Sequence, residues 1–260
     1  MGLVANRLRH TVIEAVNLKK VLGENAILEQ ASFSVPAGAT VGLLGPNGAG
    51  KTTAIRLLAG SLIPTSGRAV VGGIDVAAHP EEVRKIIGYL PEVPPLYPEM
   101  RVNEYLRFVV TLRSIPRARI SSAIAETVEL CSLETVMQRL CGQLSRGFKQ
   151  RVGIAQAILH KPPVLLLDEP TNGLDPMQTI EFRKLLRRFQ DRHTILLSTH
   201  LLAEVEECCS QAVFFAEGKT VGQFPIDSSI GRKRLEEIYF EVVAGHAAPA
   251  DQAQRKVSNI

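Results

Sequence analysis

The sequence has few cysteines, little net charge and no long apolar segment, and each shortage excludes a class of protein. The four cysteines form no C-x-x-C pair, which argues against a disulfide scaffold or a zinc site. With 30 basic and 26 acidic side chains the net charge is only +4, so bulk charge does not indicate a nucleic-acid-binding protein. No apolar run approaches the roughly 20 residues of a membrane helix, and residues 1–10 lack the apolar centre of a signal peptide. We therefore expect a soluble, cytoplasmic, globular protein.

Short apolar runs alternate with helical periodicity along most of the chain. Residues 40–44, 164–167 and 194–199 are largely apolar, which is typical of strands buried on both faces. Residues 51–62 and 177–192 have the spacing of helices with one buried face. This alternation predicts an α/β protein with a parallel sheet.

A long helical insertion is expected in the middle of this sheet. Tyr105, Val109 and Leu112 have the spacing of a buried stripe, and the whole of residues 102–140 is predicted to be helical. Shorter strands are predicted at residues 27–35, 69–71 and 86–90. The composition of residues 244–260 supports no core, so they are predicted to form a loose tail.

A glycine-rich loop lies between a predicted strand and a predicted helix. Gly45-Pro46-Asn47-Gly48-Ala49-Gly50-Lys51-Thr52 fits the pattern G-x-x-x-x-G-K-[ST]. Glycines let the backbone curl around a phosphate and aim its N–H groups inward, and a helix N-terminus adds partial positive charge. Lys51 is predicted to reach the β- and γ-phosphates of a nucleotide, and the Thr52 hydroxyl to bind Mg²⁺. A plain glycine-rich turn with a surface lysine is the alternative, and the strand–loop–helix setting weighs against it.

Two carboxylates, Asp168 and Glu169, follow another predicted strand directly. Ligands of open α/β sheets bind at the carboxyl ends of the strands. There one carboxylate can hold Mg²⁺ while the next orients and deprotonates an attacking water. As a lone motif the pair would be interpreted as exposed acids in a turn. A small GTPase is excluded because the chain has no N-K-x-D sequence for base recognition.

Further motifs follow in the order and at the spacing of one family. Residues 88–92 resemble its Q-loop, 144–151 its signature motif, 172–175 its D-loop and 198–200 its switch histidine. Together with the loop and the acidic pair, they make the chain resemble the ATP-binding-cassette (ABC) ATPases up to about residue 243. The resemblance implies an α/β P-loop NTPase fold, with a RecA-like parallel sheet core and an N-terminal antiparallel β portion. It also implies one ABC-type ATP-binding domain, residues 1–243, with a helical subdomain inserted at about residues 93–160.

The resemblance implies that the chain binds and hydrolyses ATP with Mg²⁺. Lys51, Glu169 and His200 are the expected catalytic residues, and Glu169 is expected to activate water. The Mg²⁺ ligands are expected to be Thr52, Glu92 and Asp168. The residues expected to contact the nucleotide in the same subunit are Gly45, Pro46, Asn47, Gly48, Ala49, Gly50, Lys51, Thr52, Thr53 and, beside the adenine, Leu22.

The resemblance also implies that one cassette holds only half of each ATP site. Ser145 and Gly147 are expected to meet the γ-phosphate bound to a second subunit, and Asp175 to contribute as well. Simpler roles exist beside these. Ser145 and Asp175 each have the sequence setting of a helix N-cap, and His200 could be an ordinary histidine at a strand end.

The chain departs from the usual family pattern at four positions. Leu22 stands where an aromatic ring usually stacks on adenine, and Glu92 where glutamine is usual. In the signature motif, Arg146 replaces a glycine and Phe148 a glutamine. Glu92 and the altered signature resemble the subgroup that energises drug, sodium, polysaccharide and gliding-motility exporters.

The expected function is that of an ATP-hydrolysing subunit that powers a separate transmembrane permease, an exporter, from the cytoplasmic face of the membrane. Its expected partners are the permease and a second ATP-binding subunit, most simply another copy, with no nucleic acid. The alternative is a soluble ABC ATPase that acts on ribosomes or DNA, but the chain lacks the second cassette, coiled coils and basic insertions usual there. A regulator that binds nucleotide without hydrolysis is disfavoured by the intact Asp168, Glu169 and His200.

Overall fold

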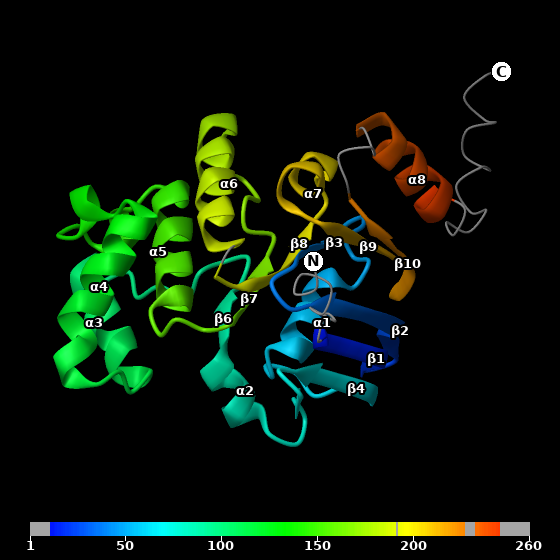
Figure 1. Ribbon diagram of the computed structural model, residues 1–260, viewed down its shortest axis with the longest axis horizontal. Helices are drawn as coiled ribbons and strands as arrows, with labels where there is room; N and C mark the ends of the chain where they lie inside the picture. Colours follow the sequence, from blue (N-terminus) through cyan, green and yellow to red (C-terminus); the bar gives the residue numbers. More distant parts are fainter. Residues whose placement is uncertain (1–10, 191, 227–231, 245–260) are drawn as a thin grey trace, which may run out of the picture.

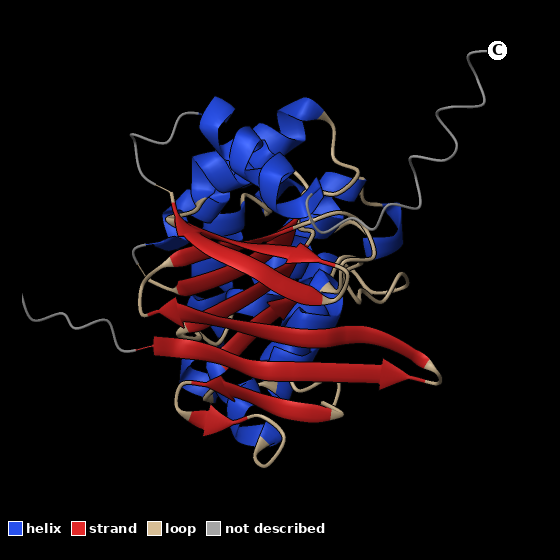
Figure 2. Cartoon of the chain, turned by 90° about the vertical axis from the view of Figure 1, so that its right-hand side faces the viewer, coloured by secondary structure: helices blue, strands red, loops and turns tan. Residues whose placement is uncertain are grey.

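The computed structural model describes residues 11–190, 192–226 and 232–244 as one continuous sheet with helices around it (Figures 1 and 2). The ten described strands follow the order β5-β4-β1-β2-β10-β9-β3-β8-β7-β6. The predicted α/β architecture is confirmed. Within the described ranges, no helix has both the length and the apolar character needed to cross a membrane.

The sheet has an antiparallel part and a mostly parallel part. In the first, β1 (Thr11–Leu22) pairs antiparallel with β2 (Asn25–Pro36) and with β4 (Ser66–Val71), which also pairs with β5 (Ile74–Asp75). The strand β1 was not predicted from its own residues. The hairpin β9 (Gln211–Ala216) and β10 (Lys219–Pro225) joins the two parts, because β9 lies parallel to β3 and β10 parallel to β2.

The parallel part positions the chemistry. It consists of β3 (Thr40–Leu44), β8 (Thr194–Thr199), β7 (Val164–Asp168) and β6 (Ile87–Leu90), paired side by side in that order. Alternate residues of β7 pack on opposite faces: Leu165 and Leu167 join one apolar cluster, and Val164 and Leu166 the other. Because both faces are covered, these strands need apolar side chains throughout, which explains the continuous runs in the sequence.

Helices cover both faces of the parallel part and extend the molecule to one side. The helices that connect the central strands are α1 (Lys51–Leu58), α2 (Pro80–Ile86), α6 (Pro176–Gln190) and α7 (Leu202–Cys208), and α8 (Arg232–Ala244) follows the last strand. Between β6 and β7 lie α3 (Val102–Leu112), α4 (Arg117–Cys131) and α5 (Arg146–Ile158). Figure 1 shows these three helices grouped at the end of the molecule farthest from β10. The predicted tail, residues 244–260, lies outside the described residues except for Ala244, the last residue of α8.

The prediction that residues 102–140 are helical throughout is correct for most of the segment and wrong for its connections. The helix α3 ends at Leu112, and α4 begins only after Pro116, whose ring disfavours helix at the preceding residue. Helix α4 ends at Cys131. The next residue, Ser132, has φ 54°, in the left-handed region, and two short 3₁₀ turns follow it. Leu112 is also 66% exposed rather than part of the buried stripe.

Candidate functional site

Three neighbouring parallel strands end at the same edge of the sheet, and polar residues follow each of them. The glycine-rich loop follows β3, Asp168 and Glu169 lie at the end of β7, and His200 follows β8. The pairing places Leu44 opposite Thr199 and Asp168 opposite Ser198. The glycine-rich loop is more than 100 residues from the other two motifs in sequence, and this pairing brings all three together.

The loop needs glycine at its two ends for steric reasons. A Cβ at Gly45 would lie 2.4 Å from the carbonyl oxygen of Phe215, and one at Gly50 would lie 2.6 Å from Leu28. Gly50 also has φ 100°, which L-residues rarely adopt, and α1 begins at the next residue. The backbone therefore curls closely against the protein here and delivers a helix N-terminus to the loop, as the motif predicts.

Lys51 lies folded over this loop. Its side chain is only 5% exposed, and Nζ donates to the carbonyl oxygens of Gly45, at 2.8 Å, and Pro46, at 3.1 Å. The same Nζ lies 3.3 Å from Oε1 of Glu169. A cation that is almost buried at the N-terminus of α1 is suited to bind an anion there.

Asp168 is fully buried and is held by two hydroxyl groups. Its Oδ1 accepts hydrogen bonds from Oγ of Ser198, at 2.7 Å, and Oγ1 of Thr52, at 2.9 Å, while the buried Oδ2 has no partner among the described residues. Burial raises the pKa of Asp168, and the bonds from Ser198 and Thr52 oppose that rise. A carboxylate with a free oxygen beside a threonine hydroxyl is a donor set that suits Mg²⁺.

Glu169 contacts the other two predicted catalytic residues, Lys51 and His200. Its Oε1 faces Lys51, and its Oε2 lies 2.9 Å from Nδ1 of His200. The backbone of Glu169 has φ 44°, in the left-handed region, and its N–H is held by Oγ of Ser198 at 2.9 Å. Such strained conformations persist only where the surroundings hold them, and they occur often at functional sites.

A hollow of about 290 Å³ lies over the loop, and Glu92 forms part of its wall. Nδ2 of Asn172 donates to Oε1 of Glu92 at 2.8 Å, and Gln150 donates to its backbone carbonyl at 3.0 Å. The described residues that line this hollow are Ile27, Asn47, Gly48, Ala49, Gly50, Lys51, Thr52, Thr53, Glu92, Glu169 and Asn172. The hollow thus brings together most of the predicted loop residues with Glu92 and Glu169.

Eight predicted residues are not among those that line this hollow. Gly45, Pro46, Asp168 and His200 contact lining residues, as described above. The remaining four are Leu22, Ser145, Gly147 and Asp175. Leu22 lies at the end of β1, and the residue is 49% exposed. Ser145 and Gly147 border a separate hollow of about 570 Å³. Asp175 accepts a hydrogen bond from the N–H of Gln178 at 2.9 Å, and Ser145 accepts one from Phe148 at 3.4 Å, so the capping roles of both are confirmed.

Sequence reasoning missed the residues that hold the site in place. Ser198 lay within a motif but was given no role, although it bonds both Asp168 and Glu169. Asn172 was likewise unassigned. Ile27 lines the hollow from β2, and no sequence signal marks it. Glu204 of α7 is 3% exposed and accepts a hydrogen bond from the Thr171 hydroxyl, two residues after Glu169.

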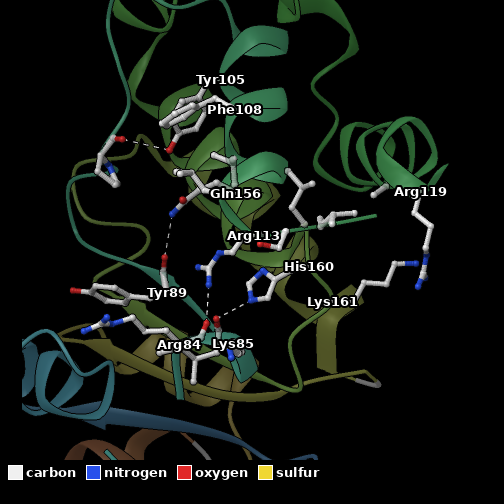
Figure 3. Close-up of a pocket in the computed structure, with 18 of the residues that line it drawn as sticks. Arg84, Lys85, Tyr89, Tyr105, Phe108, Arg113, Arg119, Gln156, His160 and Lys161 are labelled. Carbon is white, nitrogen blue, oxygen red and sulfur yellow. Dashed lines mark hydrogen bonds between the residues drawn. The ribbon is translucent and has the colours of Figure 1, made fainter. Parts of the chain in front are cut away.

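A larger hollow, of about 1030 Å³, lies away from the loop, between the sheet and the helices α3 and α4 (Figure 3). Arg113 and His160 lie side by side in it: Nη1 of Arg113 donates to the backbone carbonyl of Arg84 at 2.7 Å, and Nε2 of His160 donates to that of Ile87 at 2.9 Å. Burial lowers the pKa of His160 to about 4. Apart from Gln156, the other labelled side chains are aromatic rings and cations: Arg84, Lys85, Tyr89, Tyr105, Phe108, Arg119 and Lys161.

The buried Glu204 predicts a pH-dependent effect on stability. Burial raises its pKa, so the stability that it contributes is present at low pH and is lost as pH rises through the folded pKa. The neutral Glu204→Gln chain should therefore gain melting temperature relative to the unaltered chain, and more at pH 8 than at pH 5. Glu207→Gln, on the same helix but in ion pairs with Arg183 and Arg187, is the control and should show no such gain. A Glu204→Gln difference that is constant or smaller at pH 8 would contradict the assignment.

Comparison with known proteins assigns the family. The ABC transporter family profile matches residues 28–172, and a profile described as an AAA domain, putative AbiEii toxin, Type IV TA system matches residues 141–206. The bacitracin transport ATP-binding protein BcrA of Bacillus licheniformis is 37% identical over 226 residues, which cover 86% of this chain and 73% of that protein. The lantibiotic transport ATP-binding protein SrtF of Streptococcus pyogenes is 35% identical over 229 residues, 88% of this chain and 96% of that protein.

The solved structures agree with the sequence relatives. An ATP binding subunit of an ABC transporter superposes with a TM-score of 0.78 at 31% identity, over 89% of this chain and 99% of that chain. A dimeric bacterial ABC transporter cassette, at 23% identity and a TM-score of 0.75 over 83% of this chain and 99% of that one, shares the fold. The predicted P-loop fold is confirmed. These similarities place the chain in the ABC transporter family, as one of its ATP-hydrolysing cassettes.

Proposed function

We propose that this chain is the ATP-hydrolysing subunit that powers a separate membrane permease, an exporter, from the cytoplasmic face of the membrane. The observation that carries the proposal is the contact of Glu169 with both Lys51 and His200 beside the glycine-rich loop. The relatives named for bacitracin and lantibiotic transport support the assignment to export. The ABC domain spans residues 1–243 in this proposal, with the helical subdomain at about 93–160.

The triphosphate of ATP binds in the loop formed by residues 45–53. Lys51 then exchanges its contacts with the carbonyls of Gly45 and Pro46 for phosphate oxygens, because a charged acceptor makes the stronger hydrogen bond. Glu169 loses part of its ion pair with Lys51 and takes the proton of the attacking water. His200 orients Glu169 through the existing 2.9 Å contact and faces the γ-phosphate.

The residues present fit Mg²⁺. Thr52 and Asp168 supply oxygen donors that already lie 2.9 Å apart, and the buried Oδ2 of Asp168 has no partner among the described residues, so a cation would satisfy it. Glu92, which lines the same hollow as Thr52 and is bonded to Asn172, would be the third residue to hold the ion. When bound, Mg²⁺ neutralises charge on the β- and γ-phosphates.

The site is completed by a second copy of the chain. Ser145 and Gly147 border their own hollow, apart from the loop of the same chain, so they are available to a nucleotide held elsewhere. In the homodimer, the N-terminus of α5 in each chain, together with Asp175, contacts the triphosphate that the other chain binds. Leu22 offers the adenine an exposed apolar contact without stacking.

The permease docks at the larger hollow of Figure 3. This hollow lies between β6, which leads into the Glu92 loop, and the inserted helices α3 and α4. A segment placed there contacts both parts and can carry a relative movement between them. Aromatic rings and cations such as Tyr97, Phe108 and Arg119 favour a segment with apolar and acidic side chains.

Glu169→Gln tests the catalytic assignment. The amide keeps the shape of the side chain but cannot accept a proton, so ATP hydrolysis should fall by about 100-fold or more while ATP binding is retained. Phosphate release and nucleotide binding measure the two effects separately. Glu134→Gln, an exposed carboxylate in the 3₁₀ turn after α4, is the control and should hydrolyse ATP normally. A Glu169→Gln turnover within a few-fold of the unaltered chain would show that another group is the base.

Co-purification tests the partner. The chain should be recovered from detergent-solubilised membranes together with a polytopic membrane protein, because transport needs a membrane span that the described residues do not provide. Replacing Phe108 by aspartate, at the docking hollow, should reduce that recovery without changing ATP binding. Recovery with ribosomes or DNA in place of a membrane protein would contradict the proposal and favour a soluble ABC ATPase.

A further inference from the structure

A compact turn, residues 169–175, borders the hollow over the glycine-rich loop and also contacts the start of α5. Within it, the N–H of Asn172 donates to the carbonyl of Glu169 at 3.1 Å, and the N–H of Leu174 donates to that of Thr171 at 3.1 Å. Gly173 has φ 69°, which glycine adopts without strain. These local bonds make the turn a unit, so a displacement at one of its residues is transmitted to the others.

One side of this turn is attached to the chain's own ATP site. Asn172 donates to the carboxylate of Glu92 at 2.8 Å, and Glu169 faces Lys51 and His200. The Thr171 hydroxyl is bonded to the buried Glu204. The position of the turn therefore determines where two carboxylates of that site point.

The other side of the turn is in contact with the start of α5. A Cβ at Gly173 would lie 2.3 Å from both Cζ and Nη1 of Arg146, so the guanidinium lies directly over the glycine. One residue further on, a Cβ at Gly147 would lie 2.9 Å from the side chain of Gln178. Arg146 occupies the space that any other side chain at position 173 would need.

The charge of Arg146 is poorly matched to its position in this structure. It is the first residue of α5, where the helix carries partial positive charge, and the first turn has no acidic residue. The residue is exposed, so its contact with Gly173 can be broken without unfolding. Guanidinium groups bind phosphate through paired hydrogen bonds, and an anion at Ser145 would attract this one.

We propose that Arg146 is a positioning residue that couples the two ATP sites served by one chain. The phosphate of a nucleotide held by a second copy attracts the guanidinium away from Gly173, and the freed turn 169–175 then shifts Asn172 and Glu169 in the chain's own site. The coupling arises because Arg146 cannot contact Gly173 and that phosphate equally well at the same time. This inference rests on the proposed function, since it needs a second copy that carries ATP.

The test compares ATP hydrolysis as a function of ATP concentration in four purified full-length chains. Arg146→Gln removes the charge, and Gly173→Asn keeps Arg146 but displaces it with a side chain that tolerates positive φ. The unaltered chain should hydrolyse ATP with a Hill coefficient above one. As monomers, both variants should bind ATP in their own loop within about twofold of the unaltered chain, because Arg146 acts on the nucleotide of the second copy. As dimers they should show a Hill coefficient of one and a maximal rate lower by about fivefold or more. Arg107→Gln, an exposed arginine on α3, is the control and should behave as the unaltered chain.

Arg146→Lys separates positioning from simple loss of charge. It keeps the charge without the flat guanidinium over Gly173, so it should restore part of the rate and of the cooperativity. Unchanged cooperativity in Arg146→Gln, or weaker ATP binding as its only defect, would overturn the coupling. An unaltered dimer with a Hill coefficient of one would overturn it too. If the unaltered chain hydrolyses ATP only as a monomer, both the coupling and the composite site fail, and a measurement of mass identifies that case.

Discussion

The structure depends on the pairing of β3, β8 and β7, because it brings three polar strand ends to one edge of the sheet. The buried carboxylate of Asp168 holds these strand ends in place relative to one another. Through one oxygen it joins Thr52 at the start of α1 to Ser198 at the end of β8. Hydrogen bonds to a charged group contribute about 1.5–3 kcal/mol each, and leaving such a group unpaired in the interior costs more. The second oxygen, which has no partner among the described residues, is the part of this arrangement that protein contacts leave unsatisfied.

Above this buried layer, the catalytic charges compensate one another. Lys51 and Glu169 are almost buried, and each would be costly there alone. Their mutual contact, together with the loop carbonyls and His200, stabilises both charges until a triphosphate replaces one partner. ATP binding and the release of Glu169 are therefore linked by electrostatics. When Lys51 contacts phosphate, its ion pair with the carboxylate of Glu169 becomes weaker. The strained backbone of Glu169, held by Ser198, keeps the carboxylate aimed at the loop.

The sequence was sufficient for features that depend on neighbouring residues. The glycine-rich loop, the apolar strands and the N-caps at Ser145 and Asp175 all follow from local chemistry, and the structure contains them. Contacts between distant segments could not be predicted in this way. The bond between Asn172 and Glu92 joins residues 80 positions apart, and Arg146 contacts Gly173 only because α5 lies against the turn. The prediction that residues 102–140 are helical throughout failed around Pro116 and after Cys131, because Pro116 and Ser132 interrupt the helices of this segment.

The central claim is that the loop of one copy and Ser145 of another enclose the same triphosphate. Cysteines placed at Asn47 and Ser145 in the Glu169→Gln chain test it most directly. The four native cysteines are buried, and burial raises the pKa of Cys131 to about 12, so they should not compete for oxidation. Oxidation with ATP present should join two copies through a disulfide between positions 47 and 145, and oxidation without ATP should not. A covalent dimer whose yield does not depend on ATP, or no cross-linked dimer at all, would contradict the account.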